Sequence, residues 1–494
     1  MSDSENNETN AGDELLHRRN RVDMWREAGI EPYGCRYDDT QEVAVLKENF
    51  KDECEEDQPA KVAGRVIAKR GMGKVVFMNV EDPTGTIQLF GKKDAMSEEE
   101  FALFKKIDVG DIIGADGRLF RTKNGEITIR EFKYTLLSKA LKPLPEKWNG
   151  LKDVETRYRR RYLDLISNHD SRNTLIQRSA IIREIRRYLE DLGYMEVETP
   201  MMHPICGGAA ARPFVTHYNA LDQQMYMRIA TELYLKQLLV GGFHKVFELN
   251  RNFRNEGISK QHNPEFTALE VYQAFGNCET MMDLIEGMIR HCASTVIGTL
   301  KIVHNEEKTL DLESPWRRVE YEVLIKEKAG DDWFTLDKAG MIAKAHELGA
   351  HADDSMDEVQ IAQEVYDLIE PTLIQPTFVT RLPRELVPLA KRCTDNAALV
   401  DVYELVIDGK EISPGYTELN DPIDQRLRLE EQMQRSMGTE EEESGMIDEQ
   451  FLDALEHGMP PAGGLGLGVD RLCMLLTGAS TIRDIILFPQ LKNK

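Results

Sequence analysis

One short stretch of the chain, residues 245–275, brings together side chains that suit the binding of a nucleotide. The guanidinium of Arg254 can form two parallel hydrogen bonds to a phosphate, which a lysine does less well. Phe266 offers a flat surface for a stacked base, Glu256 can accept a hydrogen bond from an exocyclic amine, and His262 can reach a polyphosphate. These residue types indicate a nucleotide site, and a solvated hairpin with a surface ion pair is the alternative.

A second group of candidate residues flanks the dipeptide Asp408-Gly409, a strong signal for a two-residue β-turn. Such a turn places Glu404 opposite Ser413, so that Glu404 and Glu411 become diagonal neighbours on one face, about 7 Å apart or less. Two like charges at that distance are unfavourable unless a cation lies between them. Because Mg²⁺ prefers oxygen ligands and bridges phosphates, the turn predicts a magnesium site, with solvated edge residues as the alternative.

Two strands must position the nucleotide-binding residues. In the first strand, polar residues alternate with the apolar residues Phe247, Leu249 and Phe253. In the second strand, one face carries Phe266, Ala268, Glu270 and Tyr272. A period of two predicts an antiparallel pair with one face on a core and polar groups on the other.

The composition limits the classes of protein that fit. The 494 residues suggest two to four domains, and a net charge of −24 argues against a protein that coats nucleic acid non-specifically. The seven cysteines show no metal-ligand spacing, which favours reduced thiols in a cytosolic protein. There is neither a signal-peptide pattern nor an apolar run of about 18 residues, so we expect a cytoplasmic protein without a membrane span.

The sequence pattern in the first third of the chain predicts a small β domain. We expect a disordered tail over 1–12 and a helical segment over 13–55. Five short β-rich runs in 56–140, separated by turn signals, predict a five-stranded barrel of the oligonucleotide-binding (OB) type. Its binding face needs aromatic and basic side chains, for which Phe77, Arg65, Lys69 and Arg70 are available, although barrel aromatics are often core. A basic linker is expected over 141–170.

Three patterns resemble the signature motifs of the class II aminoacyl-tRNA synthetases, in the order of that family. A long helix, a strand and Pro200 resemble the first, F-R-N-E followed by a short loop and H-N-P-E-F resembles the second, and G-G-L-G-L-G-V-D-R-L resembles the third. The surroundings resemble the lysyl enzymes, which share a subclass with the aspartyl and asparaginyl enzymes, from about Arg18 to Pro489.

The resemblance implies an α+β fold, with an OB barrel that binds the anticodon. It also implies a catalytic domain over 171–494, built on an antiparallel sheet flanked by helices, with a helical insertion around 313–392. The implied function is a lysine–tRNA ligase. Such an enzyme activates L-lysine with ATP and transfers it to the 3′ end of tRNA(Lys), as a cytoplasmic homodimer with more than one Mg²⁺ per active site.

The resemblance also assigns roles to residues. The expected catalytic residues are Arg254 and Arg471. The expected ATP-binding residues are Arg254, Glu256, His262, Asn263, Phe266, Glu404, Glu411 and Arg471, of which Glu404 and Glu411 hold the metal. The expected lysine-binding residues are Gly208, Glu232, Glu270, Tyr272, Tyr416 and Glu418. The expected anticodon-binding residues are Phe77, Gln88 and Glu126.

Two residues depart from the family pattern, and two other functions are alternatives. Pro414 stands where the lysyl enzymes usually have Asn, and Cys206 stands where they usually have Pro.

A paralogue that lysylates a protein, such as elongation factor P, is one alternative, but relatives of that kind resemble the catalytic domain alone. A non-catalytic RNA-binding relative is the other, and it should have lost one of the residues Arg254, Glu404, Glu411 or Arg471, which are all present.

Overall fold

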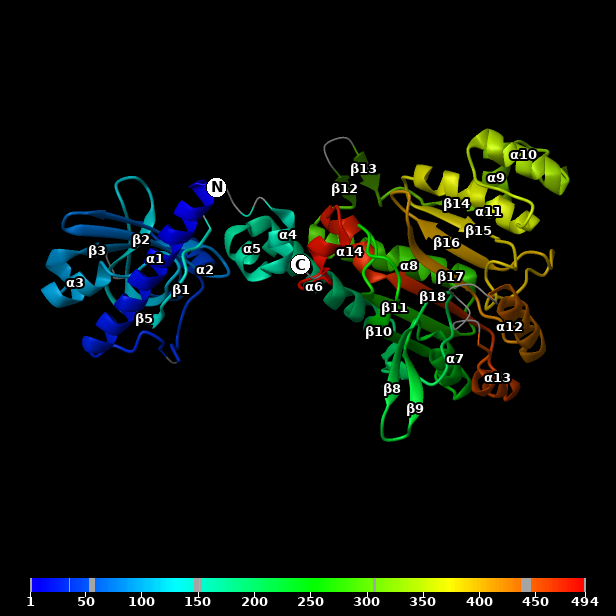
Figure 1. The fold of residues 1–494 in the computed structure, drawn as a ribbon, viewed down its shortest axis with the longest axis horizontal. Coiled ribbons are helices and arrows are strands. Elements are labelled where there is room, and N and C mark those ends of the chain that lie inside the picture. The colour runs from blue at the N-terminus through cyan, green and yellow to red at the C-terminus, as the bar shows by residue number, and fades with distance from the viewer. Residues whose placement is uncertain are drawn as a thin grey trace. The chain divides into compact units, whose positions relative to one another are not determined.

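The computed structural model describes residues 2–34, 36–52, 58–145, 151, 153–304, 308–436 and 446–492. The chain divides into two compact units, Met1–Lys152 and Asp153–Lys494. Figure 1 shows a small barrel in the first unit and a large sheet with helices in the second. Within the described residues, no helix has the length and apolar character needed to cross a membrane.

The first unit is the OB barrel that the sequence predicts. Its strands close in the order β1-β2-β3-β5-β4. They are β1 (Pro59–Met72), β2 (Val75–Glu81), β3 (Thr86–Lys92), β4 (Ile112–Arg121) and β5 (Ile127–Ser138). The helices of this unit are α1 (Ser2–Glu27), α2 (Val43–Glu48) and α3 (Glu98–Phe104), with a 3-10 turn at Lys93–Ala95. Along β2, Val76, Met78 and Val80 are buried, so the residues between them face outward.

Two boundaries differ from the sequence-based expectation. Helix α1 begins at Ser2, where a disordered tail was expected over 1–12, and no proline interrupts that stretch. Within the expected linker 141–170, residues from Asp153 onward belong to the second unit. They form α4 (Val154–Arg159) and α5 (Arg161–Ser167). Arg161 is buried and donates to the carboxylate of Asp164 at 2.8 Å, so at least this basic residue has a structural role.

The second unit is built on an eight-stranded sheet in the order β14-β15-β16-β17-β18-β11-β10-β6. Its strands are β6 (Met195–Glu196), β10 (Lys245–Phe253), β11 (Glu265–Ala274), β14 (Arg317–Glu320), β15 (Thr377–Thr380), β16 (Val402–Val406), β17 (Glu411–Thr417) and β18 (Ala462–Gly468). The six strands from β15 to β10 pair antiparallel, and the two edge strands pair parallel. The expected antiparallel sheet is therefore present, with parallel edges.

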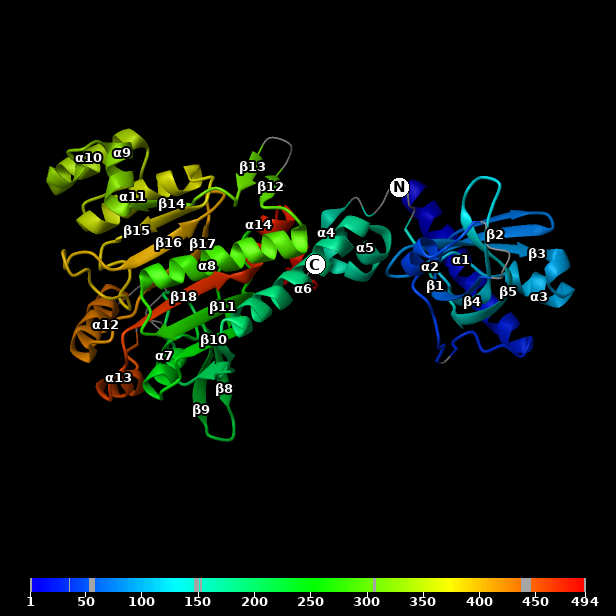
Figure 2. The ribbon, with the colours of Figure 1, turned by 180° about the vertical axis from the view of Figure 1, so that it is seen from behind.

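Helices cover both faces of this sheet. Figure 2 shows α6 (His169–Asp191) and α8 (Cys278–Cys292) lying across one face, where apolar residues of β10, β11 and β18 join their core. On the other face, α7 (Glu232–Val240) and α13 (Glu449–Glu456) pack together through Leu235, Leu239, Phe451 and Leu455. The pocket described below lies on this second side of the sheet.

The remaining elements form smaller groups. A three-stranded sheet consists of β7 (Met202–His203), β8 (Phe214–Tyr218) and β9 (Gln223–Met227), and a hairpin of β12 (Lys301–His304) and β13 (Lys308–Asp311). The insertion contains α9 (Tyr321–Ala329), α10 (Lys338–Leu348) and α11 (Glu358–Ile369), with 3-10 turns at Trp333–Thr335 and Glu370–Thr372. These helices share a core with apolar residues of β15 and β16. The other helices are α12 (Pro422–Ser436), α14 (Val469–Thr477) and α15 (Ile482–Ile485), and a π-helical turn at Ala293–Ile297 ends α8.

Candidate active site

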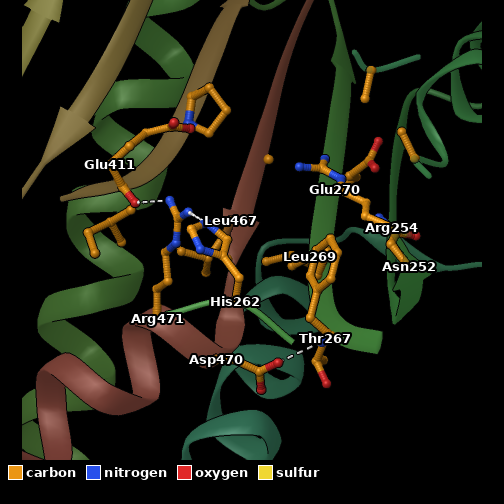
Figure 3. A pocket seen from close by; sticks show the side chains of 18 of the residues that line it. Asn252, Arg254, His262, Thr267, Leu269, Glu270, Glu411, Leu467, Asp470 and Arg471 are labelled. Atoms are coloured by element: carbon orange, nitrogen blue, oxygen red, sulfur yellow. Dashed lines mark hydrogen bonds between the residues drawn. The ribbon is translucent and has the colours of Figure 1, made fainter. Parts of the chain in front are cut away.

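A pocket lies over β11, β17 and β18. The loop between β10 and β11 and the start of α14 contribute to its walls. Figure 3 shows Arg254 and Glu270 on one side, with Arg471, His262 and Glu411 opposite. Most of the residues expected to bind ATP and lysine line it: Gly208, Glu232, Arg254, Glu256, His262, Asn263, Phe266, Glu270, Tyr272, Glu411, Tyr416 and Arg471. Glu404 and Glu418 stand just behind this lining.

The polar face of the hairpin is a pocket floor and not a solvated surface. β10 and β11 pair with Glu248 opposite Glu270 and Asn252 opposite Phe266. Glu248 is buried and accepts a hydrogen bond of 2.6 Å from the buried Arg228. The alternative of a solvated hairpin is therefore wrong.

Arg254 is a cation without a fixed anion. Its guanidinium carbon lies 5.2 Å from the centre of the Phe266 ring, so the two side chains stack. Burial lowers the pKa of Arg254, and within the described residues no carboxylate forms an ion pair with it. Arg254 is half-buried, and its Nε is enclosed without a hydrogen-bond partner, so this end of the pocket is suited to an anionic ligand.

A second basic group stands opposite, where α14 begins. Arg471 donates to the Glu411 carbonyl at 2.7 Å and to Nε2 of His262 at 3.2 Å. An arginine can only donate, so Nε2 is the acceptor and Nδ1 carries the proton, 2.9 Å from the Ser259 hydroxyl. Burial and the nearby Arg471 lower the pKa of His262, which keeps the imidazole neutral.

The loop residues Glu256 and Asn263 complete this end of the pocket. Glu256 is exposed at the mouth, where its carboxylate is open to a ligand. The side-chain amide of Asn263 donates to the Glu265 carbonyl at 2.6 Å and so shapes the loop, while its oxygen is buried without a hydrogen-bond partner.

Asp470 fixes the walls of the pocket relative to each other. Its carboxylate accepts from the Thr267 amide at 2.8 Å (Figure 3). It also accepts from Arg178 on α6 at 2.8 Å. Thr267 follows Phe266 in the chain, and Asp470 precedes Arg471. Two residues expected to bind ATP, Phe266 and Arg471, are therefore next to chain positions held by one buried carboxylate.

The turn at Asp408-Gly409 forms as predicted, but the register beyond it differs. Both residues have positive φ, 60° and 67°, as a two-residue turn of type I′ requires. Glu404 lies opposite Pro414 and not opposite Ser413, because a β-bulge interrupts the pairing between Leu405 and Val406. The bulge reverses the alternation along β17. Glu411 therefore shares its face with Pro414, Tyr416 and Glu418, which a regular strand would turn away from it.

Glu404 and Glu411 stand close together, and a third carboxylate joins them. Glu370, at the end of α11, accepts from the Glu411 amide at 2.8 Å, and the Tyr366 hydroxyl lies 3.4 Å from Glu404. Burial together with Glu411 and Glu370 raises the pKa of Glu404. Glu370 and Tyr366 were not foreseen from the sequence, since a single Glu before a Pro carries no signal of its own.

These carboxylates offer hard oxygen donors that repel each other, which fits a divalent cation. Within the described chain, however, no group of three or more His, Cys, Asp or Glu side chains is arranged to hold a metal ion by itself. A cation here needs further ligands, and the oxygens of a bound polyphosphate are suitable.

Three glutamates form the other end of the pocket. The Glu270 carboxylate accepts from the Thr231 amide at 2.9 Å, and the Tyr272 hydroxyl lies 3.3 Å from it. Burial raises the pKa of Glu270 to about 6. The Tyr416 hydroxyl donates to Glu232 at 2.8 Å. Burial also raises the pKa of Glu418, which is wholly enclosed.

Lys236 is the one cation paired with these carboxylates in the described chain. Its ammonium lies 2.6 Å from Glu232 and 2.5 Å from Glu418. The sequence reasoning missed it, although the spacing of four residues from Glu232 in the helical segment T-E-L-Y-L-K was a usable signal.

Two glycines keep the space between these side chains open. Gly208 has φ of +87°, and a Cβ atom there would lie 3.2 Å from Ala230. A Cβ atom on Gly464 would lie 2.0 Å from a carboxylate oxygen of Glu418 and 2.6 Å from the Tyr272 ring. Any larger residue at either position would disturb the acidic end of the pocket.

The two departures from the family pattern lie in different surroundings. Pro414 lines the pocket, where its ring is 3.7 Å from the position of a Cβ on Gly466. Cys206 is buried in a small cluster with Ala211, Tyr226 and Ile229, and it does not line this pocket.

The expected anticodon residues lie together on the barrel. Phe77 faces outward, with its ring centre 5.1 Å from that of Phe90. Gln88, two residues from Phe90 on the same face of β3, donates to Glu126 at 3.2 Å. Two basic residues expected on this face have structural roles instead, because Arg65 donates to the Gly110 carbonyl and Lys69 to the carbonyls of Lys105 and Ile107.

Comparisons with known proteins agree with this geometry. Residues 153–492 match the family model "tRNA synthetases class II (D, K and N)", and residues 60–137 match the model of an OB-fold nucleic acid binding domain. The lysine–tRNA ligase of Carboxydothermus hydrogenoformans is 49% identical over 97% of this chain and 97% of its own length. The lysine–tRNA ligases of Staphylococcus saprophyticus and Bacillus subtilis are each 47% identical, over 98% and 100% of this chain and over 99% and 100% of their own lengths.

Proposed function

We infer that this chain, which belongs to the class II tRNA synthetases (D, K and N), is a lysine–tRNA ligase that activates lysine with ATP and transfers it to tRNA. One observation carries the choice of amino acid. Three buried carboxylates, Glu232, Glu270 and Glu418, face a single buried ammonium, that of Lys236. This end of the pocket therefore requires a cationic ligand.

We place the side chain of lysine among these glutamates, with Tyr272 and Tyr416 as walls and the bare backbone of Gly208 against the amino acid. Aspartate would be repelled by the carboxylates, and asparagine would leave them unpaired. Ornithine is shorter by one methylene, and such a difference is worth only about 1–3 kcal/mol in a pocket. The site should therefore reject aspartate and asparagine strongly and ornithine less.

ATP occupies the opposite end in this proposal. The adenine stacks between Phe266 and Arg471, and Glu256 accepts from its exocyclic amine. Arg254 binds the α-phosphate, and His262 and Arg471 bind the outer phosphate oxygens. Asn263 orders the loop that closes over the nucleotide.

Glu404 and Glu411 would hold Mg²⁺, and more than one ion per site is expected. Their hard oxygen donors and the raised pKa of Glu404 fit a bound cation. The ion would supply charge neutralisation for the leaving pyrophosphate.

The residues of the chain act mainly by positioning and by electrostatic stabilisation. The lysine carboxylate attacks the α-phosphorus of ATP, the bond to the bridging oxygen breaks, and pyrophosphate leaves with that electron pair. Arg254 stabilises the charge that develops on the α-phosphate, and Arg471 stabilises the leaving group. A terminal hydroxyl of tRNA then attacks the acyl carbon and AMP leaves. No side chain needs to act as a covalent nucleophile.

The barrel supplies tRNA recognition in this proposal. Phe77 stacks on an anticodon base, while Gln88 and Glu126 form hydrogen bonds with base edges. We further propose that the enzyme is a cytoplasmic homodimer whose interface includes α6, the helix of the first class II motif.

Amino-acid-dependent exchange between ATP and pyrophosphate tests the proposal. Without tRNA, all twenty amino acids are compared in the presence of Mg²⁺, and we expect exchange with lysine alone. Charging of tRNA with lysine should follow when tRNA is added. Exchange with another amino acid, or no exchange by folded protein, would contradict the proposal.

A further inference from the structure

Lys236 is a buried ammonium that touches two ligand-binding carboxylates. It lies on α7 with no exposed surface. Its Nζ atom is 2.6 Å from one oxygen of Glu232, 2.5 Å from Glu418 and 3.5 Å from the Leu389 carbonyl. The two glutamates come from α7 and from the end of β17, so Lys236 joins two elements of the pocket.

Lys236 itself does not line the pocket. It approaches Glu232 and Glu418 from behind, and the ring of Tyr416 lies 5.6 Å away. The second oxygen of Glu232 accepts from the Tyr416 hydroxyl at 2.8 Å. Within the described residues, neither oxygen of Glu418 has a hydrogen-bond partner, and Oε2 forms the ion pair with Lys236. Lys236 thus pairs with both carboxylates, while the buried Oε1 of Glu418, which lies next to Tyr272 and Gly464, has no partner.

The surroundings of Lys236 explain why its charge matters. From β11, Glu270 and Tyr272 face the same space, and from β17, Tyr416 and Glu418 do so. The helix α13 presents the apolar Phe451 and Leu455. When all three glutamates are ionised, a state that bound ammonium groups favour, the three carboxylates and one ammonium leave an uncompensated charge of −2. Lysine brings two ammonium groups, at its α and ε positions, so the charges of cluster and ligand match.

We propose that Lys236 is a positioning residue for amino-acid selection. It holds Glu232 and Glu418 at a fixed separation and sets the charge of the cluster, so that the pocket accepts two ammonium groups at the spacing found in lysine. This inference rests on the proposed function, because it concerns the same pocket and the same substrate. It goes beyond the proposed function because it assigns the selectivity for the length and charge of the amino acid to a residue that does not touch the amino acid.

The variant Lys236→Met tests this role in ATP–pyrophosphate exchange. Removing one partner of a buried charge pair leaves the other unpaired, so we expect the KM for lysine to rise about 30-fold or more. We expect kcat and the KM for ATP to stay within about threefold, because Lys236 is remote from the nucleotide. The preference for lysine over ornithine in kcat/KM should fall about tenfold. The control Lys245→Met, on β10 with its ammonium at the Leu192 carbonyl, should change none of these values.

The pH dependence separates positioning from a general loss of stability. Without the ammonium of Lys236, the remaining carboxylates hold a proton more tightly, and this proton must leave when the ammonium of lysine binds. The excess KM of Lys236→Met should therefore shrink as the pH rises from 7 to 9. An unchanged KM with folded protein, or a uniform loss of kcat for all substrates and pH values, would overturn the inference.

A second measurement on the unaltered protein holds even if the variant does not fold. Cadaverine is lysine without its carboxyl group and has two ammonium groups, whereas pentylamine has one. We expect cadaverine to compete with lysine at least tenfold better than pentylamine does. Equal competition would overturn the charge match. Absence of lysine-dependent exchange by the unaltered protein would instead contradict the proposed function.

Discussion

Two clusters of three glutamates border the same pocket, and they differ in their cations. The amino-acid cluster, Glu232, Glu270 and Glu418, contains the ammonium of Lys236. The cluster proposed to hold a metal ion, called the metal cluster below, consists of Glu370, Glu404 and Glu411 and has a tyrosine hydroxyl and a backbone amide. No lysine or arginine of the described chain forms an ion pair with it.

The difference indicates which ligand each cluster receives. A carboxylate cluster that already contains one ammonium has a limited remaining charge, which organic ammonium groups can neutralise. A cluster without any cation suits a divalent ion, which contributes two charges at one point. Similar residues in one pocket can therefore select different cations, because their neighbours set the charge that remains.

The largest effect is expected from Glu411→Gln in the metal cluster. Loss of one metal-binding carboxylate removes several kcal/mol of charge stabilisation, so we expect kcat for ATP–pyrophosphate exchange to fall about 1000-fold. The binding of lysine alone, measured by calorimetry, should be unchanged. The exposed Glu313→Gln is the matched control. Equal weakening of lysine binding would show that the two clusters do not act separately.

Glu418→Gln, in contrast to Glu411→Gln, should weaken the binding of lysine and leave the use of ATP unchanged. It removes a charge from the amino-acid cluster and leaves Lys236 with one carboxylate, at a cost of about 2–5 kcal/mol. We expect the KM for lysine to rise about 100-fold while the KM for ATP stays within about threefold. A rise in the KM for ATP of similar size would contradict the assignment of the clusters.

Phe77→Ala tests whether both clusters are independent of the barrel. Loss of one base-stacking ring costs about 1–3 kcal/mol, so the KM for tRNA should rise about tenfold or more. Exchange between ATP and pyrophosphate, which needs no tRNA, should be unaffected. Phe77→Tyr keeps the ring and should charge tRNA like the unaltered enzyme. A loss of exchange in Phe77→Ala would refute this independence.

The smallest effect concerns pH. Burial raises the pKa of Glu270 to about 6, and only its ionised form attracts an ammonium group. The KM for lysine should therefore increase as the pH falls through 6, by about fourfold at half a unit below the pKa. Steady-state kinetics between pH 5.5 and 7.5 would measure this change. A KM for lysine that does not change over this range would contradict an ionisable group at the ammonium site.

The sequence was sufficient for the hairpin and the barrel, because these follow from short-range alternation and from turn signals, and the family resemblance supplied the candidate ligand-binding residues that line the pocket. The register of β17 was predicted wrongly, since the bulge between Leu405 and Val406 has no signature in the residues around the turn. That bulge decides which side chains face the pocket, Pro414 among them. Position along a strand therefore did not suffice to place them.

Two residues were missed for another reason. Glu370 and Lys236 act through contacts with residues distant in the sequence, Glu411 and Glu418, and such contacts exist only in the folded chain. The spacing of Lys236 from Glu232 was visible, but spacing alone does not reveal that both side chains are buried. The burial gives this pair its importance, because desolvated charges interact strongly.

Calorimetric titration of lysine into the enzyme, with Mg²⁺ or with EDTA, tests the separation of the two clusters most directly. We expect the Kd for lysine to be the same within about twofold in both conditions, because Lys236 and the three glutamates of the amino-acid cluster need no metal. In a parallel titration of ATP into the enzyme, the affinity for ATP should fall at least tenfold with EDTA. A loss of lysine binding in EDTA would show that one shared cation site serves both ligands and would contradict the account.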